Sequence, residues 1–147
     1  MVYTDNSVVE IFQRQVKKYG DRACVAWKKD GVYVDISWNG MDAMIRNLGN
    51  YLLSIGIRKG DKVALFSPNR YEWWIADQAI LSIGAVNVPI YATNSAEEAF
   101  YVLNHSDSKA CLVATADHLE RVLRFRSRLK KLKHIVLFDP PAPKKQG

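Results

Sequence analysis

The chain has 147 residues, of which 48% are hydrophobic and 24% charged, and its formal net charge is +6 at pH 7. This length suffices for one domain with its own core, and the composition excludes an intrinsically disordered chain. The most apolar window, 75–92, is interrupted by polar residues and a proline, which indicates neither a membrane span nor a secretion signal. We therefore expect a globular, cytoplasmic domain.

A helix and a hairpin are the first elements expected in chain order. Ser7 precedes a run with apolar residues at helical spacing, and Glu10 stands where a capping box requires it, so we expect a helix over 7–19. Two short β-type runs, 23–27 and 32–36, flank an Asp-Gly pair. That pair favours the positive φ angles of a tight hairpin turn.

The next helix is expected to begin at Ser37 and to end before Gly56. It carries methionine and leucine at helical spacing. We interpret this stripe as core packing and not as a cofactor-binding surface.

Residues 56–93 have the pattern of a complete strand, helix and strand unit. The run 62–67 is short and almost wholly apolar, which is typical of a strand buried on both faces. Asn69 with Glu72 three residues later predicts the N-cap of the following helix. A β-branched run over 85–91 then predicts a second strand, parallel to the first because such crossovers are right-handed.

The last third of the chain repeats this alternation. Ser95 and Glu98 form another capping-box pattern, and Thr115 is expected to cap a longer helix whose apolar arc continues to Leu132. Apolar runs at 110–114 and 134–138 are expected to be strands.

The predicted fold class is therefore α/β, with a parallel sheet covered by helices on both faces and an appended β-hairpin. We assign residues 1–139 to this domain. The proline-rich and lysine-rich end, 140–147, has the composition of a linker.

Two motifs resemble a known superfamily. SPNRYEWWIADQAILSIGAVNVPIYAT, residues 67–93, resembles the N-terminal region of the AMP-forming acyl-CoA synthetases, and most of all the long-chain fatty acid CoA ligases. Residues 36–65 resemble an earlier motif of these enzymes, in which an aromatic residue after Ser or Thr opens a helix that leads into a Gly-x-x-x-Gly-Asp turn. The resemblance extends over 7–139. Ala92 stands where many relatives have proline, which we expect to loosen this loop.

The resemblance implies an N-terminal portion of the adenylate-forming fold. It implies an enzyme that converts a fatty acid, ATP and CoA into acyl-CoA, AMP and diphosphate through an acyl-adenylate, with Mg as a further cofactor. It also implies that the phosphate loop and the catalytic lysine lie downstream, because this sequence has no glycine-rich run with Ser, Thr and Lys. We therefore predict no catalytic, cofactor-binding or metal residue here, and expect a truncated fragment that is inactive alone, partners with the remainder of the ligase chain and tends to self-associate.

In open α/β sheets, ligands bind beyond the carboxyl ends of the strands. The residues at those ends are Ser67, Pro68, Asn69, Tyr91, Ala92 and Thr93. We interpret Asn69 as a cap and not as an anion site, because Glu72 already supplies negative charge there. At least one of Trp73 and Trp74 is expected to be core, although either could line an acyl tunnel or stack on a base.

The histidines and cysteines suggest no site. His105, His118 and His134 are scattered and lack a carboxylate or cysteine at catalytic or metal-ligand spacing. Cys24 and Cys111 each lie in an apolar run, so we expect buried free thiols in a reducing compartment.

Two other functional hypotheses stay open. A free-standing module of the flavodoxin or receiver type fits the size, but the sequence lacks the aspartate cluster or hydroxyl-rich phosphate loop of such modules. The second hypothesis rests on charge: residues 117–147 hold nine Lys or Arg and three Asp or Glu, which is the whole net charge. A basic helix over 119–133 could bind nucleic acid or an anionic membrane. A solvated basic face is the simpler interpretation, so we expect no nucleic acid partner and keep peripheral membrane contact open.

Overall fold

The computed structural model describes residues 7–139, and the expected linker at 140–147 lies outside the described residues. The helices and strands follow one another as α1 (Val8–Tyr19), β1 (Ala23–Lys29), β2 (Val32–Ser37), α2 (Trp38–Ser54), β3 (Lys62–Phe66), α3 (Tyr71–Ser82), β4 (Val86–Ile90), α4 (Ala96–His105), β5 (Ala110–Val113), α5 (Ala116–Leu123), a 3₁₀ turn (Arg126–Arg128) and β6 (His134–Leu137). This order confirms the predicted alternation.

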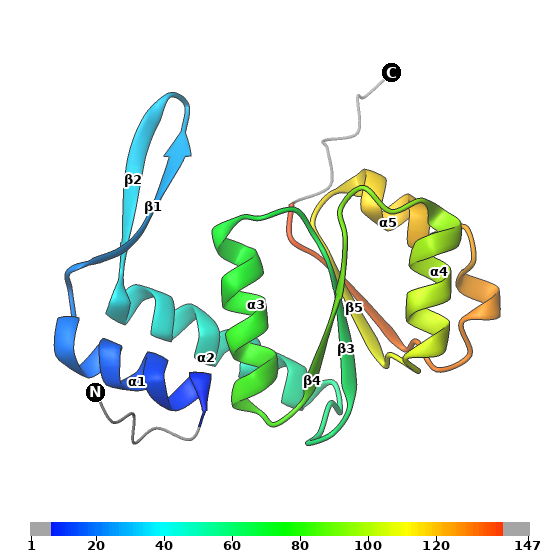
Figure 1. Cartoon of the computed structure of the whole chain (residues 1–147), viewed down its shortest axis with the longest axis horizontal. Helices are drawn as coiled ribbons and strands as arrows, with labels where there is room; N and C mark the ends of the chain where they lie inside the picture. Colours follow the sequence, from blue (N-terminus) through cyan, green and yellow to red (C-terminus); the bar gives the residue numbers. More distant parts are fainter. Residues whose placement is uncertain (1–6, 140–147) are drawn as a thin grey trace.

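The N-terminal part combines α1 with an antiparallel hairpin of β1 and β2. The Ser7 hydroxyl accepts a hydrogen bond from the Glu10 amide (3.2 Å), as expected for the N-cap of α1. Asp30 and Gly31 have φ angles of 50° and 86°, the left-handed conformations that a tight hairpin turn requires. The hairpin projects away from the rest of the molecule (Figure 1).

A four-stranded parallel sheet forms the other part, with strand order β4-β3-β5-β6. In register, Phe66 of β3 lies beside Ile90 of β4 and Val113 of β5. The β3 side chains 63–66 and the β5 side chains 110–113 have no exposed surface. Because both faces of these strands are covered, their sequences are apolar without alternation.

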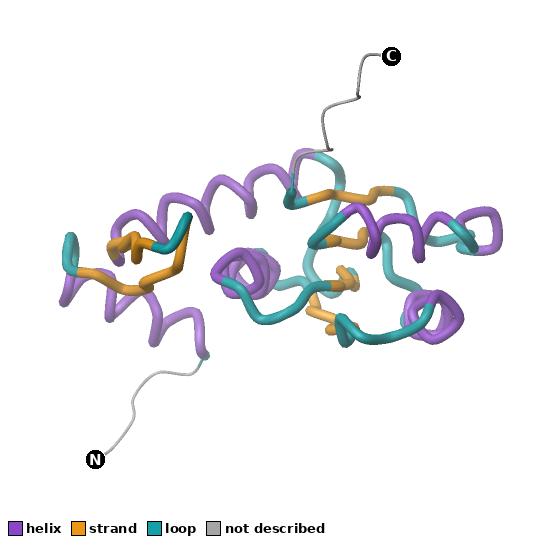
Figure 2. Tube along the Cα trace, turned by 90° about the horizontal axis from the view of Figure 1, so that it is seen from above, coloured by secondary structure: helices purple, strands orange, loops and turns teal. Residues whose placement is uncertain are grey.

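Helices cover both faces of the sheet, as predicted (Figure 2). On one face, Leu52 of α2 and Ile80 of α3 belong to the core cluster of Leu65. On the other face, Leu103 of α4 and Val122 of α5 belong to the core cluster of Phe66. A third cluster joins the N-terminal part to α3 through aromatic residues, among them Phe12, Trp38 and Trp74.

The predicted N-cap at Asn69 is wrong. Arg70 occupies the N-cap position of α3, with extended backbone angles and no side-chain hydrogen bond to the helix. The Glu72 carboxylate was expected to accept a hydrogen bond from the backbone of the cap residue. It instead accepts two hydrogen bonds from the Arg70 guanidinium (2.7 and 2.8 Å). A bidentate charged pair is stronger than a neutral amide cap, so the local capping pattern gives way to it.

The predicted long helix after Thr115 is also wrong, and with it the continuous basic helix over 119–133. Thr115 caps α5 as expected, but α5 ends at Leu123 and only a 3₁₀ turn follows. A helix that continued to Leu132 would place Arg124 with Arg128 and Arg126 with Lys130 four residues apart, and such like-charge pairs destabilise a helix.

The helices are short, from eight residues in α5 to seventeen in α2. None of the helices within residues 7–139 combines the length and the apolar surface needed to cross a bilayer. Each instead buries one side on the sheet or on the aromatic cluster.

The two cysteines have different environments. Cys111 is fully buried in β5, as expected, whereas Cys24 in β1 is only half-buried, so the prediction of two buried thiols is half wrong. Both are free thiols. Cys24 is less covered because only one face of the hairpin packs on the rest of the protein.

Candidate functional site

A hollow of about 560 Å³ lies at the carboxyl edge of the sheet, beyond β3 and β4. Its lining residues are Ser67, Pro68, Asn69, Trp73, Pro89, Ile90, Tyr91, Ala92 and Thr93. All six residues that the sequence placed at the strand ends are among them. The hollow therefore lies at the edge where ligands bind in open α/β sheets.

The lining of this hollow is uncharged and mainly apolar. Trp73, the proline rings and Ile90 supply hydrocarbon surface, and none of the nine lining residues, all within 7–139, carries a charge. The Ser67 hydroxyl donates to the neighbouring carbonyl of Pro68 (2.9 Å), so this group is already satisfied. Asn69, Tyr91 and Thr93 are the other lining residues with polar side-chain groups.

The two tryptophans serve different clusters. Trp73 faces the hollow and packs on the core cluster of α2 and α3 against the sheet. Trp74 packs edge to face on Phe12 and Trp38, with ring centroids 5.8 and 6.2 Å apart. Neither tryptophan is fully buried, so the expectation of a core tryptophan is met only in part: each is partly buried against a core cluster, and Trp73 also forms a wall of the hollow.

Helix α5 holds the loop that forms one wall of the hollow. Arg121 donates from Nη1 to the carbonyl oxygens of Ala92 (3.1 Å) and Asn94 (2.8 Å). Nε2 of His118 lies 3.2 Å from the same Ala92 carbonyl. These contacts fix a loop that the replacement of proline by Ala92 was expected to loosen.

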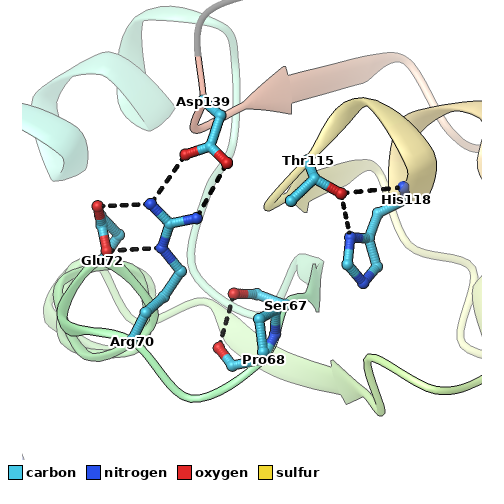
Figure 3. A network of polar contacts seen from close by, with 7 residues as sticks. All are labelled: Ser67, Pro68, Arg70, Glu72, Thr115, His118 and Asp139. Carbon is cyan, nitrogen blue, oxygen red and sulfur yellow. Dashed lines mark hydrogen bonds and ion pairs between the residues drawn. The ribbon is translucent and has the colours of Figure 1, made fainter.

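Sequence reasoning missed this role of His118. Its ring is buried edge to face against Phe66, with ring centroids 4.6 Å apart. The carbonyl of Ala92 only accepts, so Nε2 donates to it and Nδ1 accepts from the Thr115 hydroxyl (2.7 Å) (Figure 3). The only sequence signal was its position three residues after the cap at Thr115, because the partner lies 26 residues away.

Arg70 joins two carboxylates at the rim of the same edge. It pairs with Glu72 of α3 and with Asp139, 69 residues later in the chain (2.8 and 3.2 Å) (Figure 3). Partial burial opposes ionisation of Glu72, but the Arg70 hydrogen bonds outweigh it and lower the pKa of that carboxyl. The same two carboxylates raise the pKa of Arg70. Arg70 therefore ties the chain beyond β6 to the start of α3.

The other two histidines lie elsewhere. His105 stacks on Tyr101 of α4 (5.5 Å between centroids), and His134 begins β6 at the opposite edge of the sheet. Within residues 7–139, no three His, Cys, Asp or Glu side chains are grouped as a metal site requires. The donor chemistry near the hollow does not suit a triphosphate with its metal ion, since the lining provides no cation.

A family model described as AMP-binding enzyme matches residues 12–147. Among curated relatives, the long-chain-fatty-acid–CoA ligase FadD15 of Mycobacterium bovis is 38% identical over 114 residues, which are 78% of this chain and 19% of the relative. The fatty acyl-CoA synthetase A of Dictyostelium discoideum is 35% identical over 121 residues, 82% of this chain and 18% of the relative. The chain thus spans about a fifth of the length of these relatives.

Solved structures show the same fold. A long-chain-fatty-acid-CoA ligase (FadD1) from Archaeoglobus fulgidus superimposes with a TM-score of 0.84 at 16% identity, covering 97% of this chain and 29% of that one. The N-terminal domain of FACL13 from Mycobacterium tuberculosis gives 0.82 at 21% identity, covering 97% and 40%. Neither comparison favours the flavodoxin, receiver or nucleic-acid hypotheses.

Proposed function

The chain belongs to the family of AMP-binding enzymes, and from this we propose that it forms the N-terminal scaffold of an ATP-dependent long-chain fatty acid CoA ligase. The reaction joins a fatty acid to CoA, with cleavage of ATP to AMP and diphosphate through an acyl-adenylate. The observation that carries the proposal is the 38% identity with a relative named as such a ligase.

Within this proposal, ATP, CoA and Mg bind mainly to parts of the ligase outside residues 7–139. Magnesium, when bound, neutralises phosphate charge during attack on the α-phosphate. The uncharged hollow cannot supply that neutralisation. Its apolar lining suits the hydrocarbon part of a fatty acid better than a phosphate.

The residues of this chain then have positioning roles. His118 and Arg121 hold the loop at Ala92, and Arg70 directs the chain after Asp139 along the carboxyl edge. The remainder of the ligase is the main partner of this edge. Self-association of the isolated chain is expected through exposed apolar residues of the hairpin, such as Val32 and Tyr33. A single monomeric species in sedimentation velocity at micromolar concentration would contradict it.

The test of the function is fatty-acid-dependent exchange between ATP and pyrophosphate. We expect no exchange above background from the purified 147-residue chain, because in this proposal the groups that stabilise the charge on the transferring adenylyl group belong to other parts of the ligase. Measurable exchange by this chain alone would overturn the location of the active site.

A chimera tests the scaffold role directly. Residues 7–139 replace the matching segment of the Mycobacterium bovis ligase FadD15, and we expect exchange to persist with long-chain acids. Arg121→Met in the chimera should lower exchange by loosening the Ala92 loop, while Lys28→Met in the exposed hairpin should not. A folded chimera without exchange would contradict the proposal.

We also propose a cytoplasmic location with peripheral membrane contact, since long-chain acids partition into bilayers.

A further inference from the structure

A basic surface lies at the end of the molecule opposite the hairpin, beside α4 (Figure 1). It is formed by the irregular connection between α5 and β6, residues 124–133, which we call the basic ridge. Its cationic residues are Arg124, Arg126, Arg128, Lys130, Lys131 and Lys133, and all except Arg126 are exposed. None of these residues lines the hollow at the carboxyl edge of β3 and β4.

Aromatic rings beneath the ridge fix its arginines. The guanidinium of Arg128 lies 4.3 Å from the ring centroid of Phe100 and 5.5 Å from that of Phe125. The two rings pack on each other with centroids 5.2 Å apart. Arg126 donates to the carbonyl of Leu129 (3.3 Å), and the buried Leu129 anchors the ridge to the core. The cations are therefore presented by a packed surface and not by a free tail.

The lysines of the basic ridge are available to bind a partner. Within residues 7–139, no carboxylate forms an ion pair with Lys130, Lys131 or Lys133, although Asp107 lines the small hollow beside the first two. Glu97 pairs only loosely with Arg124 (3.6 Å). The exposed positive charge thus exceeds the acidic charge around it, and it attracts an extended anionic surface.

We infer that the basic ridge is a docking surface for the anionic phospholipid headgroups of a bilayer. Charge complementarity carries the inference, because clustered lysines and arginines next to a membrane gain attraction from its negative surface potential. A single-stranded nucleic acid is disfavoured because Arg128 already covers the Phe100 ring that a base would need.

The test is co-sedimentation of the full chain with vesicles of phosphatidylcholine containing about one third phosphatidylserine. We expect binding to these vesicles, none to pure phosphatidylcholine, and release as salt rises from about 50 to about 300 mM. Lys130→Glu/Lys131→Glu should weaken binding about 30-fold or more, since each basic residue near the surface contributes roughly fivefold.

The matched control is Lys28→Glu/Lys29→Glu, which makes the same change in net charge on the exposed hairpin. This variant should bind nearly as well as the parent chain. Equal loss in both variants would overturn the ridge as the docking surface, because only net charge would matter. Tighter binding to an oligonucleotide than to the vesicles, or salt-insensitive binding to neutral lipid, would also overturn it. The vesicles contain no fatty acid or ATP, so either result is independent of the ligase activity.

Discussion

The parallel sheet and the N-terminal hairpin differ in how completely they are covered. Residues 63–66 of β3 have no exposed surface, because helices lie on both faces of the sheet. In the hairpin, Val32 and Tyr33 are 66% and 70% exposed, and contact with the rest of the protein runs through one aromatic cluster. We conclude that the sheet supplies most of the stability and that the hairpin opens more easily.

Helix α3 belongs to both regions through two adjacent side chains. Trp73 packs toward the sheet cluster and the hollow, whereas Trp74 packs on Phe12 and Trp38 of the N-terminal part. Neighbouring helix residues point about 100° apart, so one helix supports two cores. The following predictions separate the two regions.

The largest expected difference is in thiol reactivity. Complete burial raises the pKa of Cys111 in the sheet to about 12, whereas burial raises the pKa of the half-buried Cys24 in the hairpin without sealing it from solvent. With a disulfide reagent at about pH 8, Cys24 should react about 1,000-fold faster, because Cys111 reacts only when the sheet opens. Cys24→Ser should remove the fast phase. Two thiols reacting at one rate would remove the distinction between the regions.

Truncating a core side chain of the sheet should cost the most stability. Phe66→Ala removes a fully buried ring from the sheet face that α4 and α5 cover and should lower the free energy of unfolding by about 3–5 kcal/mol. Tyr33→Ala in the exposed hairpin should change it by less than about 0.5 kcal/mol. Urea denaturation measures both variants, and similar costs would show that the hairpin is as tightly packed as the sheet.

The two tryptophans should couple to different partners. A double-mutant cycle of Trp74→Ala with Phe12→Leu should give an interaction energy of about 0.5–1.5 kcal/mol, since these rings meet edge to face. The same cycle with Trp73→Ala should give a value near zero, because Trp73 packs on the other cluster. Equal coupling in both cycles would mean that α3 does not divide the two cores.

The smallest effect is expected at Arg70, which is 27% exposed. Arg70→Gln leaves Glu72 and Asp139 unpaired, and because both carboxylates reach solvent it should cost only about 0.5 kcal/mol at about pH 7. The folded-state pKa of Glu72 is lowered, so its contribution is present above the ordinary glutamate pKa and is lost as the pH falls through the folded value. The difference between variant and parent should therefore shrink at about pH 3. A constant difference would contradict the role of Glu72.

Much of the fold was determined by the sequence alone, because its signals are local. Ser7, Ser37, Ser95 and Thr115 cap helices within three residues of themselves, and their predictions are confirmed. Buried strands are recognised in the sequence as continuous apolar runs, and the hairpin turn is recognised from its Asp-Gly pair. The carboxyl edge of the sheet, and with it six of the nine residues that line the hollow, followed from the parallel direction of the strands without knowledge of side-chain contacts.

Only the tertiary structure decided how distant groups meet. Arg70 pairs with Glu72 and Asp139, and it occupies the N-cap position that was predicted for Asn69. Asp139 lies 69 residues away, so the sequence around the helix could not show this contact. Helix α5 ends at Leu123 although the apolar periodicity continues to Leu132, so periodicity alone overestimated its length. His118 acquired its role from a carbonyl on another loop. Capping and periodicity report energies within one or two turns, whereas these outcomes depend on contacts that form only after the sheet has assembled.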